Sequence, residues 1–182
     1  MFRTPHIAVT TSMAILLQAP PEGILGAIIG STFPDIDIKI GLVHRTWTHW
    51  LPFYIFPAVY IFYSLNDPSF ASNIFIKLFF SFLAWFCIGA SMHILEDCIT
   101  YSGIPLLSPT TSGYPPKAFM LSNQSRFSLM LTTSGGSLEK IIMIIVIAMV
   151  AMIFIRDSSY RIEYLQMLEH WLYNLRYGIG GI

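Results

Sequence analysis

Long apolar runs separated by short polar segments dominate the chain. The longest covers residues 74–99, and a second, 141–155, is apolar on every side and is bracketed by Lys140 and Arg156. A third run covers 50–65 and carries aromatic residues near its ends. A helix needs about 20 mostly apolar residues to cross a bilayer, and aromatic residues gather at the membrane interfaces. These runs therefore predict membrane helices.

Two shorter apolar runs lie near the N-terminus. Residues 7–18 and 24–33 are separated by a Pro- and Gly-containing break at 19–23. Each run is too short to span a bilayer as a straight helix. They are interpreted as tilted half-length helices packed against the others, or as a re-entrant hairpin. The predicted fold is an all-α, polytopic membrane helix bundle with about four to five membrane helices.

The C-terminal half adds a long polar loop and an amphipathic helix. Residues 99–138 are rich in Ser, Thr, Gly and Pro, and within them 118–131 reads as two short strands around a polar turn. In 159–176, leucines recur at helical spacing, which favours an interfacial helix or a protein-partner surface. We predict one membrane-embedded domain, 1–182, with a metal-site core at 1–130, a last membrane helix at 139–156 and the amphipathic helix at 159–176.

Composition agrees with a membrane protein. The chain is 54% hydrophobic and 11% charged, whereas soluble domains carry about a quarter charged residues. Ten basic residues balance ten acidic ones, so net charge does not favour a nucleic-acid partner. Two cysteines are too few for a disulfide framework. Membrane lipids are the expected partners.

The histidines and aspartates are concentrated where the apolar runs begin or end. If the first four runs alternate across the membrane, seven of these residues reach the same face. They are His6, Asp35, Asp37, His44, His49, His93 and Asp97. Any one of them alone would suit a structural role, but ionisable groups beside hydrocarbon are costly. Together they predict a metal site, for which mixed His and Asp ligands suit zinc most, with Mn or Fe(II) as alternatives.

Local spacing supports coordination. His93 and Asp97 are four residues apart on a predicted helix and so share one face. One can bind a cation while the other also binds it or orients its partner. Asp35 and Asp37 follow Pro34, where they could bridge two metals or divide into ligand and base.

Between His44 and His49 the spacing is poor for one straight helical face, so we expect a loop that leads into a helix, with Thr48 as its N-cap. Arg45 lies inside the cluster and could clamp a phosphate or offset the aspartate charges. Glu96 beside Asp97 could be a base or a residue of a solvated helix face.

The motifs that hold these residues resemble those of the YdjM-type family of inner-membrane metal-dependent hydrolases. The matching segments are His6, Pro34-Asp35-Ile36-Asp37, His44-Arg45-Thr46-Trp47-Thr48-His49, His93-Ile94-Leu95-Glu96-Asp97 and Gly103-Ile104-Pro105-Leu106-Leu107-Ser108-Pro109. The resemblance covers about residues 1–130. It implies a bacterial inner-membrane protein with several membrane passes.

That family is in turn similar to zinc-dependent phospholipase C, whose all-helical members bind clustered metals. The similarity implies a ligand set drawn from the seven residues: His6, one of Asp35 and Asp37, one of His44 and His49, and the pair His93 and Asp97. The further downstream histidines and glutamate of those relatives are not recognisable here. The resemblance therefore implies one or two bound metals.

The predicted activity is phosphoester hydrolysis on a phospholipid or another lipid-linked substrate. Asp35, Asp37 or Glu96 would act as the base toward a metal-activated water, and Arg45 would stabilise charge on the substrate. A non-enzymatic scaffold or assembly factor with a structural metal is the alternative. A metal transporter is a weaker one, because 141–155 holds no polar residue.

Basic residues give an orientation. Five of them share the predicted site face and three lie opposite if 141–155 spans: Arg3, Lys39, Arg45, Lys117 and Arg126 against Arg156, Arg161 and Arg176. Cytoplasmic loops are enriched in Lys and Arg, so the site is predicted at the cytoplasmic face.

Overall fold

The structure is a computed structural model that describes residues 4–41, 44–67, 73–99, 104–105, 126–127 and 137–177. The described part is almost entirely helical, in the order α1 (Thr4–Leu16), α2 (Pro21–Gly30), α3 (Ile36–Lys39), a 3-10 turn η1 (Trp47–His49), α4 (Pro52–Leu65), α5 (Ile74–Ile99), α6 (Ser137–Arg156) and α7 (Ser158–Tyr177). Two short strands, β1 (Ile104–Pro105) and β2 (Arg126–Phe127), pair antiparallel. The all-α fold class is confirmed.

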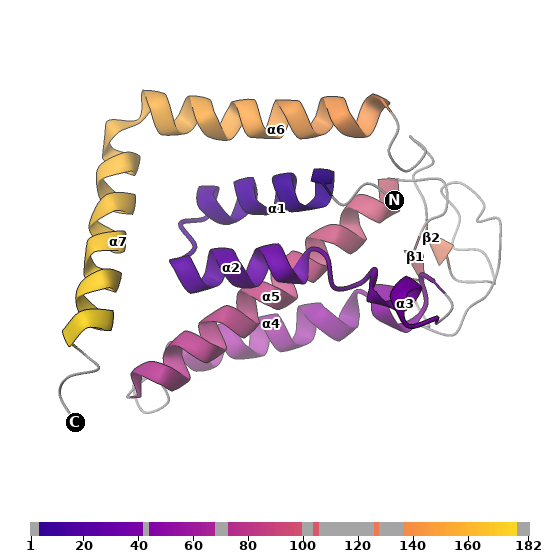
Figure 1. The fold of residues 1–182 in the computed structure, drawn as a ribbon, viewed down its shortest axis with the longest axis horizontal. Helices are drawn as coiled ribbons and strands as arrows, with labels where there is room; N and C mark the ends of the chain where they lie inside the picture. Colours follow the sequence, from indigo (N-terminus) through magenta and orange to yellow (C-terminus); the bar gives the residue numbers. More distant parts are fainter. Residues whose placement is uncertain are drawn as a thin grey trace.

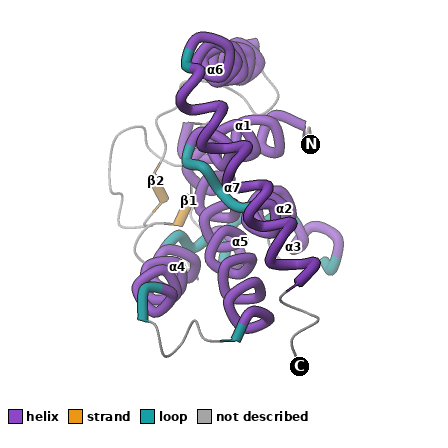
Figure 2. The backbone as a smooth tube through the Cα atoms, turned by 90° about the vertical axis from the view of Figure 1, so that its left-hand side faces the viewer, coloured by secondary structure: helices purple, strands orange, loops and turns teal. Residues whose placement is uncertain are grey.

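Helix α5 is the central element. Helices α2 and α4 pack along it, and α1 forms a hairpin with α2 (Figure 1). Helix α6 runs over α1, and α7 then turns across the end of the bundle where α5 begins (Figures 1 and 2). The two short N-terminal runs therefore lie as half-length helices against the longer ones.

Glycines allow α2 and α5 to touch along their backbones. A Cβ at Gly26 would overlap the Phe82 carbonyl, and a Cβ at Gly30 would overlap the Phe86 carbonyl. A Cβ at Gly89 of α5 would in turn meet the Ala27 carbonyl. Small residues spaced three and four apart are a common device for close helix packing in membranes. This contact fixes the position of the end of α2 relative to the last turns of α5.

The outer surface is strongly apolar. On α4, Phe56, Tyr60 and Tyr63 are between 71% and 79% exposed, and on α6 Ile155 is 73% exposed. Exposed apolar surface on this scale marks contact with lipid or protein. Among the described residues one helix, Ile74–Cys98 with 25 residues, is long and apolar enough to span a membrane. The predicted four to five membrane helices are not confirmed beyond this one.

Two local expectations changed. Helix α4 begins at Pro52 with Leu51 as its N-cap, so the predicted start at His49 or Trp50 with Thr48 as cap is wrong. The Thr48 hydroxyl instead donates to Asp37 Oδ2 at 2.6 Å. Of the two strands predicted within 118–131, only Arg126–Phe127 is described, and it pairs with Ile104–Pro105; the other residues of 118–131 lie outside the described residues. Most of the predicted loop at 99–138, including Lys117, lies outside the described residues, as does Arg3.

Candidate metal centre

The seven predicted metal-site residues gather at the end of the bundle where α5 finishes. They are His6 in the first turn of α1, Asp35 and Asp37 at the start of α3, His44 and His49 between α3 and α4, and His93 and Asp97 near the end of α5. Six of the seven are at most 3% exposed. The His44 side chain is 30% exposed and marks the open side of the cluster.

Four side chains form the inner part of the cluster. The Nε2 atom of His49 lies 3.3 Å from Asp97 Oδ2 and 3.8 Å from Asp35 Oδ1. The Nε2 atom of His93 lies 3.6 Å from each of the same two oxygens. Ligands about 2.0–2.1 Å from a tetrahedral zinc lie roughly 3.3 Å from one another. These four distances from imidazole nitrogen to carboxylate oxygen are in the range expected for ligands that share one metal ion.

His6 and His44 extend this inner set on either side. Ligand atoms of His6, His93 and Asp97 lie within 4.8 Å of one another, and so do those of Asp35, His44 and His49. His44 Nε2 is 4.0 Å from Asp35 Oδ1. The cluster thus offers two adjacent groups of three ligands that have no residue in common.

Each histidine is held from behind through its Nδ1 atom. His93 Nδ1–H donates to the Ser31 carbonyl at 2.6 Å, and a carbonyl can only accept. His6 Nδ1–H donates to Glu96 Oε2 at 2.6 Å, and His44 Nδ1–H to Asp37 Oδ1 at 3.0 Å. This arrangement leaves the Nε2 lone pair of each imidazole directed at the cluster, as in known metal-binding histidines.

Asp37 orients its neighbours from outside the inner set. Its Oδ2 accepts hydrogen bonds from the Thr48 hydroxyl and from the Arg45 backbone N–H. The Thr48 oxygen in turn accepts from His49 Nδ1–H at 3.1 Å. Asp37 is therefore bonded to His44 directly and to His49 through Thr48. Asp35, by contrast, turns its Oδ1 toward the Nε2 atoms.

Arg45 is buried, and its guanidinium donates to Asp97 Oδ1 at 2.8 Å. Its backbone is left-handed, with φ of 59°, a conformation that non-glycine residues adopt rarely. The bond to Oδ1 leaves Oδ2 of Asp97 facing His49 and His93. Of the two roles predicted for Arg45, the geometry supports offsetting aspartate charge.

The pKa values reflect these contacts. Burial alone would raise the pKa of Asp37, but the nearby His49 imidazole and the hydrogen bonds with Thr48 and His44 outweigh it and hold that pKa well below its usual value. Burial lowers the pKa of His44, which favours the neutral imidazole that binds metal. Burial also opposes charge on His49, but the carboxylates of Asp37 and Asp97 lie close to its ring and raise its pKa overall. A metal at His49 would therefore compete with a proton.

The donor set fits a divalent cation. Asp35 Oδ1 and the Nε2 atoms of His44, His49 and His93 are buried and make no hydrogen bond within the described part of the chain. Buried polar atoms without partners are rare and call for an explanation. The cluster holds three buried aspartates and one buried cation, Arg45, which leaves an excess of two negative charges among these four residues when the histidines are neutral. A divalent metal ion would satisfy both the unpaired atoms and the charge.

The remaining predicted residues take positions around this set. Glu96 is bonded to His6 through Oε2, while its Oε1 is buried and makes no hydrogen bond among the described residues. Sequence reasoning missed the Ser31 carbonyl, which orients His93, and the relay through Thr48. Spacing could not reveal Ser31, because a backbone carbonyl carries no residue-type signature. The spacing of the glycines at 23, 26 and 30 could have indicated the close helix contact that brings this carbonyl there, but it was not used.

Comparison with known families identifies the chain. The YdjM inner membrane protein family matches residues 1–162, which confirms the predicted resemblance and indicates an inner-membrane location. Neither the curated proteins nor the solved structures provide a significant match. The family match covers most of the chain and includes the buried His and Asp cluster. The chain therefore belongs to the family of YdjM inner membrane proteins.

Proposed function

We propose that the chain is a membrane-bound metal-dependent hydrolase that cleaves a phosphoester of a lipid or lipid-linked substrate. The observation that supports it is the convergence of buried Nε2 and carboxylate oxygen atoms at separations of 3.3–4.0 Å. Each of the histidines in this cluster is oriented through its Nδ1 atom. Such preorganisation of ligands is what a bound metal requires.

Asp35, His49, His93 and Asp97 would hold the metal, with His44 and His6 available for a second ion. Zinc suits this ligand set best, and Mn or Fe(II) suit it next. A metal bound there supplies an activated water nucleophile at neutral pH and positive charge for phosphoryl oxygens. Asp37 and Arg45 would orient the metal ligands. Asp37 is hydrogen-bonded to His44 and Thr48, and the Arg45 guanidinium is hydrogen-bonded to Asp97.

Glu96 is the best placed base. Its Oε2 is bonded to His6, while Oε1 is buried beside the cluster with no hydrogen bond in the described chain. A carboxylate within reach of the attacking water accepts its proton and can pass it to the leaving oxygen. Asp37 suits this task less well, because both of its oxygens accept hydrogen bonds.

The surroundings of the open side favour a lipid substrate. Ile38, Ile40 and Trp47 flank His44 in sequence and are 49%, 61% and 57% exposed. Exposed apolar and Trp side chains of this kind rest in the interfacial region of a bilayer. A phosphoester in a lipid head group lies at that depth. We propose that the site faces the cytoplasm, in agreement with the distribution of basic residues.

The test is release of phosphate or head group from lipid extracts by purified protein, with metal content measured by elemental analysis. The double variant His93→Ala, Asp97→Ala should lose both metal and turnover. The variant Glu169→Ala, on the exposed surface of α7, serves as the matched control and should keep both. Equal lipid hydrolysis by the double variant and the unmodified protein would refute the proposal.

A structural metal site in a scaffold or assembly factor is the second candidate. The observation that favours it is burial, since His44 is the one ligand with a substantially exposed side chain. Structural zinc sites are closed, whereas catalytic ones keep an open position. A stoichiometric metal whose removal unfolds the protein, with no chelator-sensitive turnover on lipid extracts, would favour this candidate.

A further inference from the structure

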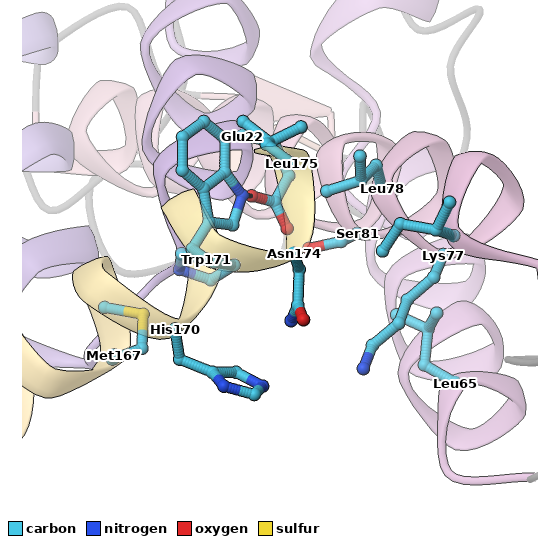
Figure 3. Close-up of a pocket in the computed structure, with 12 residues that line it drawn as sticks. Glu22, Leu65, Lys77, Leu78, Ser81, Met167, His170, Trp171, Asn174 and Leu175 are labelled. Carbon is cyan, nitrogen blue, oxygen red and sulfur yellow. Dashed lines mark hydrogen bonds between the residues drawn. The ribbon is translucent and has the colours of Figure 1, made fainter. Parts of the chain in front are cut away.

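A second polar cluster lies at the opposite end of α5. A cavity of about 250 Å³ opens between the start of α5, the start of α2, the end of α4 and helix α7. Lys77 of α5 and His170 and Asn174 of α7 point into its open side (Figure 3). His170 is the one histidine that the metal cluster does not include. With about 1.5 Å per residue, Lys77 lies about 24 Å along the helix from His93.

The cavity combines charges of both signs with an apolar wall. Trp171 Nε1–H donates to Glu22 Oε2 at 2.6 Å, which positions the carboxylate and the indole together. Lys77 lines the same cavity and supplies the opposite charge. Leucine and methionine side chains, including Leu78 and Met167, form much of the remaining wall. A ligand for this cavity therefore has an apolar portion and two opposite charges.

We propose that this cavity binds a phospholipid whose head group carries a phosphate and a primary ammonium group. Lys77, with Asn174 and His170, contacts the phosphate. The Glu22 carboxylate accepts from the ammonium group, and the Trp171 ring offers it a cation–π contact. The start of an acyl chain lies against Leu78 and Met167. The site is separate from the metal centre and does not depend on the hydrolase proposal.

Charge complementarity disfavours head groups that lack either the phosphate or the primary ammonium group. A purely anionic head group would meet the Glu22 carboxylate, and a purely cationic amphiphile would meet the Lys77 ammonium. A quaternary ammonium group has no N–H to donate to Glu22, so a choline head group forms one contact fewer. Like-charge contacts and unpaired polar groups in a partly desolvated site discriminate strongly between ligands.

The position of the cavity matches the depth of a head group. Lys77 lies in the first turn of α5, the described helix that is long enough to span the membrane. Helix α7 crosses that end of the bundle, and its Leu172 and Tyr173 are 58% and 61% exposed. An amphipathic helix in this place lies in the membrane interface. The bound lipid would therefore fasten α7 to α5 at the face opposite the metal centre.

The experiment uses the full chain in detergent, titrated with lipids that carry brominated acyl chains. Quenching of Trp171 reports binding, and Trp171→Phe gives the contribution of the other tryptophans. We expect brominated phosphatidylethanolamine to quench at concentrations at least tenfold lower than brominated phosphatidylglycerol or phosphatidylcholine. Equal quenching by the three lipids of unmodified protein would overturn the proposal without any variant.

Variants locate the charges. Lys77→Gln and Glu22→Gln should each weaken phosphatidylethanolamine binding about tenfold, because each removes one charge-assisted hydrogen bond. Gln at position 22 can still accept from Trp171, so the change removes charge alone. Lys39→Gln, at the other end of the molecule, is the matched control and should bind as the unmodified protein does. If Lys39→Gln weakens binding as much as Lys77→Gln, the assigned site is wrong. Unchanged metal content in all three would separate this result from the metal centre.

Discussion

The two ends of α5 hold polar clusters built on opposite principles. At the C-terminal end, His93 and Asp97 are at most 1% exposed, and the histidines of the cluster are fixed from behind by a second residue. At the N-terminal end, Lys77 is exposed and projects into an open cavity. Fixed ligands suit a small ion with strict geometry, whereas mobile side chains suit a larger, flexible amphiphile. Burial and orientation, more than residue type, therefore separate the two ends.

The largest effect on metal binding should come from replacing Asp35 or Asp37 of the buried cluster by asparagine. Asp35→Asn should leave purified protein without bound metal, because it removes a charged inner ligand. Asp37→Asn should weaken metal affinity about 10- to 100-fold, since Asp37 orients the ligands through its hydrogen bonds to His44 and Thr48 and is not itself an inner ligand. Competition with a chelator, read by elemental analysis, measures both. Equal losses in the two variants would contradict the distinction between inner ligand and orienting residue.

Metal removal should change the thermal stability of the unmodified protein but not that of Asp35→Asn. A chelator should lower the unfolding temperature of the unmodified protein, because metal binds the folded state. It should not change the unfolding temperature of Asp35→Asn, which is already without metal. Differential scanning fluorimetry with and without chelator makes the measurement. A chelator shift of the same size in both proteins would place the metal elsewhere.

An intermediate effect is expected from the helix contact that supports the buried end. Gly30→Ala places a Cβ against the Phe86 carbonyl and should lower the free energy of unfolding by about 1–3 kcal/mol. Because Ser31 follows Gly30 directly, displacement of its carbonyl from His93 should also weaken metal binding. Thermal unfolding and metal affinity are measured together. Ile29→Ala, next in sequence but 43% exposed, is the control and should keep its metal affinity.

The smallest effect is the expected difference in the free energy of unfolding between two substitutions of Arg45. Both Arg45→Gly and Arg45→Ala remove the guanidinium from Asp97 and should weaken metal binding equally. Glycine accepts the left-handed backbone, so Arg45→Gly should be more stable than Arg45→Ala by about 1 kcal/mol. Chemical unfolding of the two variants gives this difference. If alanine proved the more stable, the left-handed conformation would not be required there.

Local patterns in the sequence predicted the helices well where the signal was long. Helix α5 covers the apolar run at 74–99, and α7 covers the amphipathic segment at 159–176. Prediction failed at the short connection before α4, because the Thr48 hydroxyl forms a hydrogen bond with Asp37 and does not cap the helix. Side-chain partners that are eleven residues apart cannot be read from helix-capping preferences alone.

The sequence by itself determined the residue set of the buried cluster and the family, because ionisable groups placed at the ends of apolar runs are few and their motifs are ordered. Only the tertiary structure decided their roles. Asp35 faces the imidazoles while Asp37 orients them, Arg45 turns to Asp97, and a Ser31 carbonyl holds His93 across 62 residues of chain. These roles depend on how closely α2 approaches α5 and on the loop path that follows. Both are set by packing between segments that are distant in sequence.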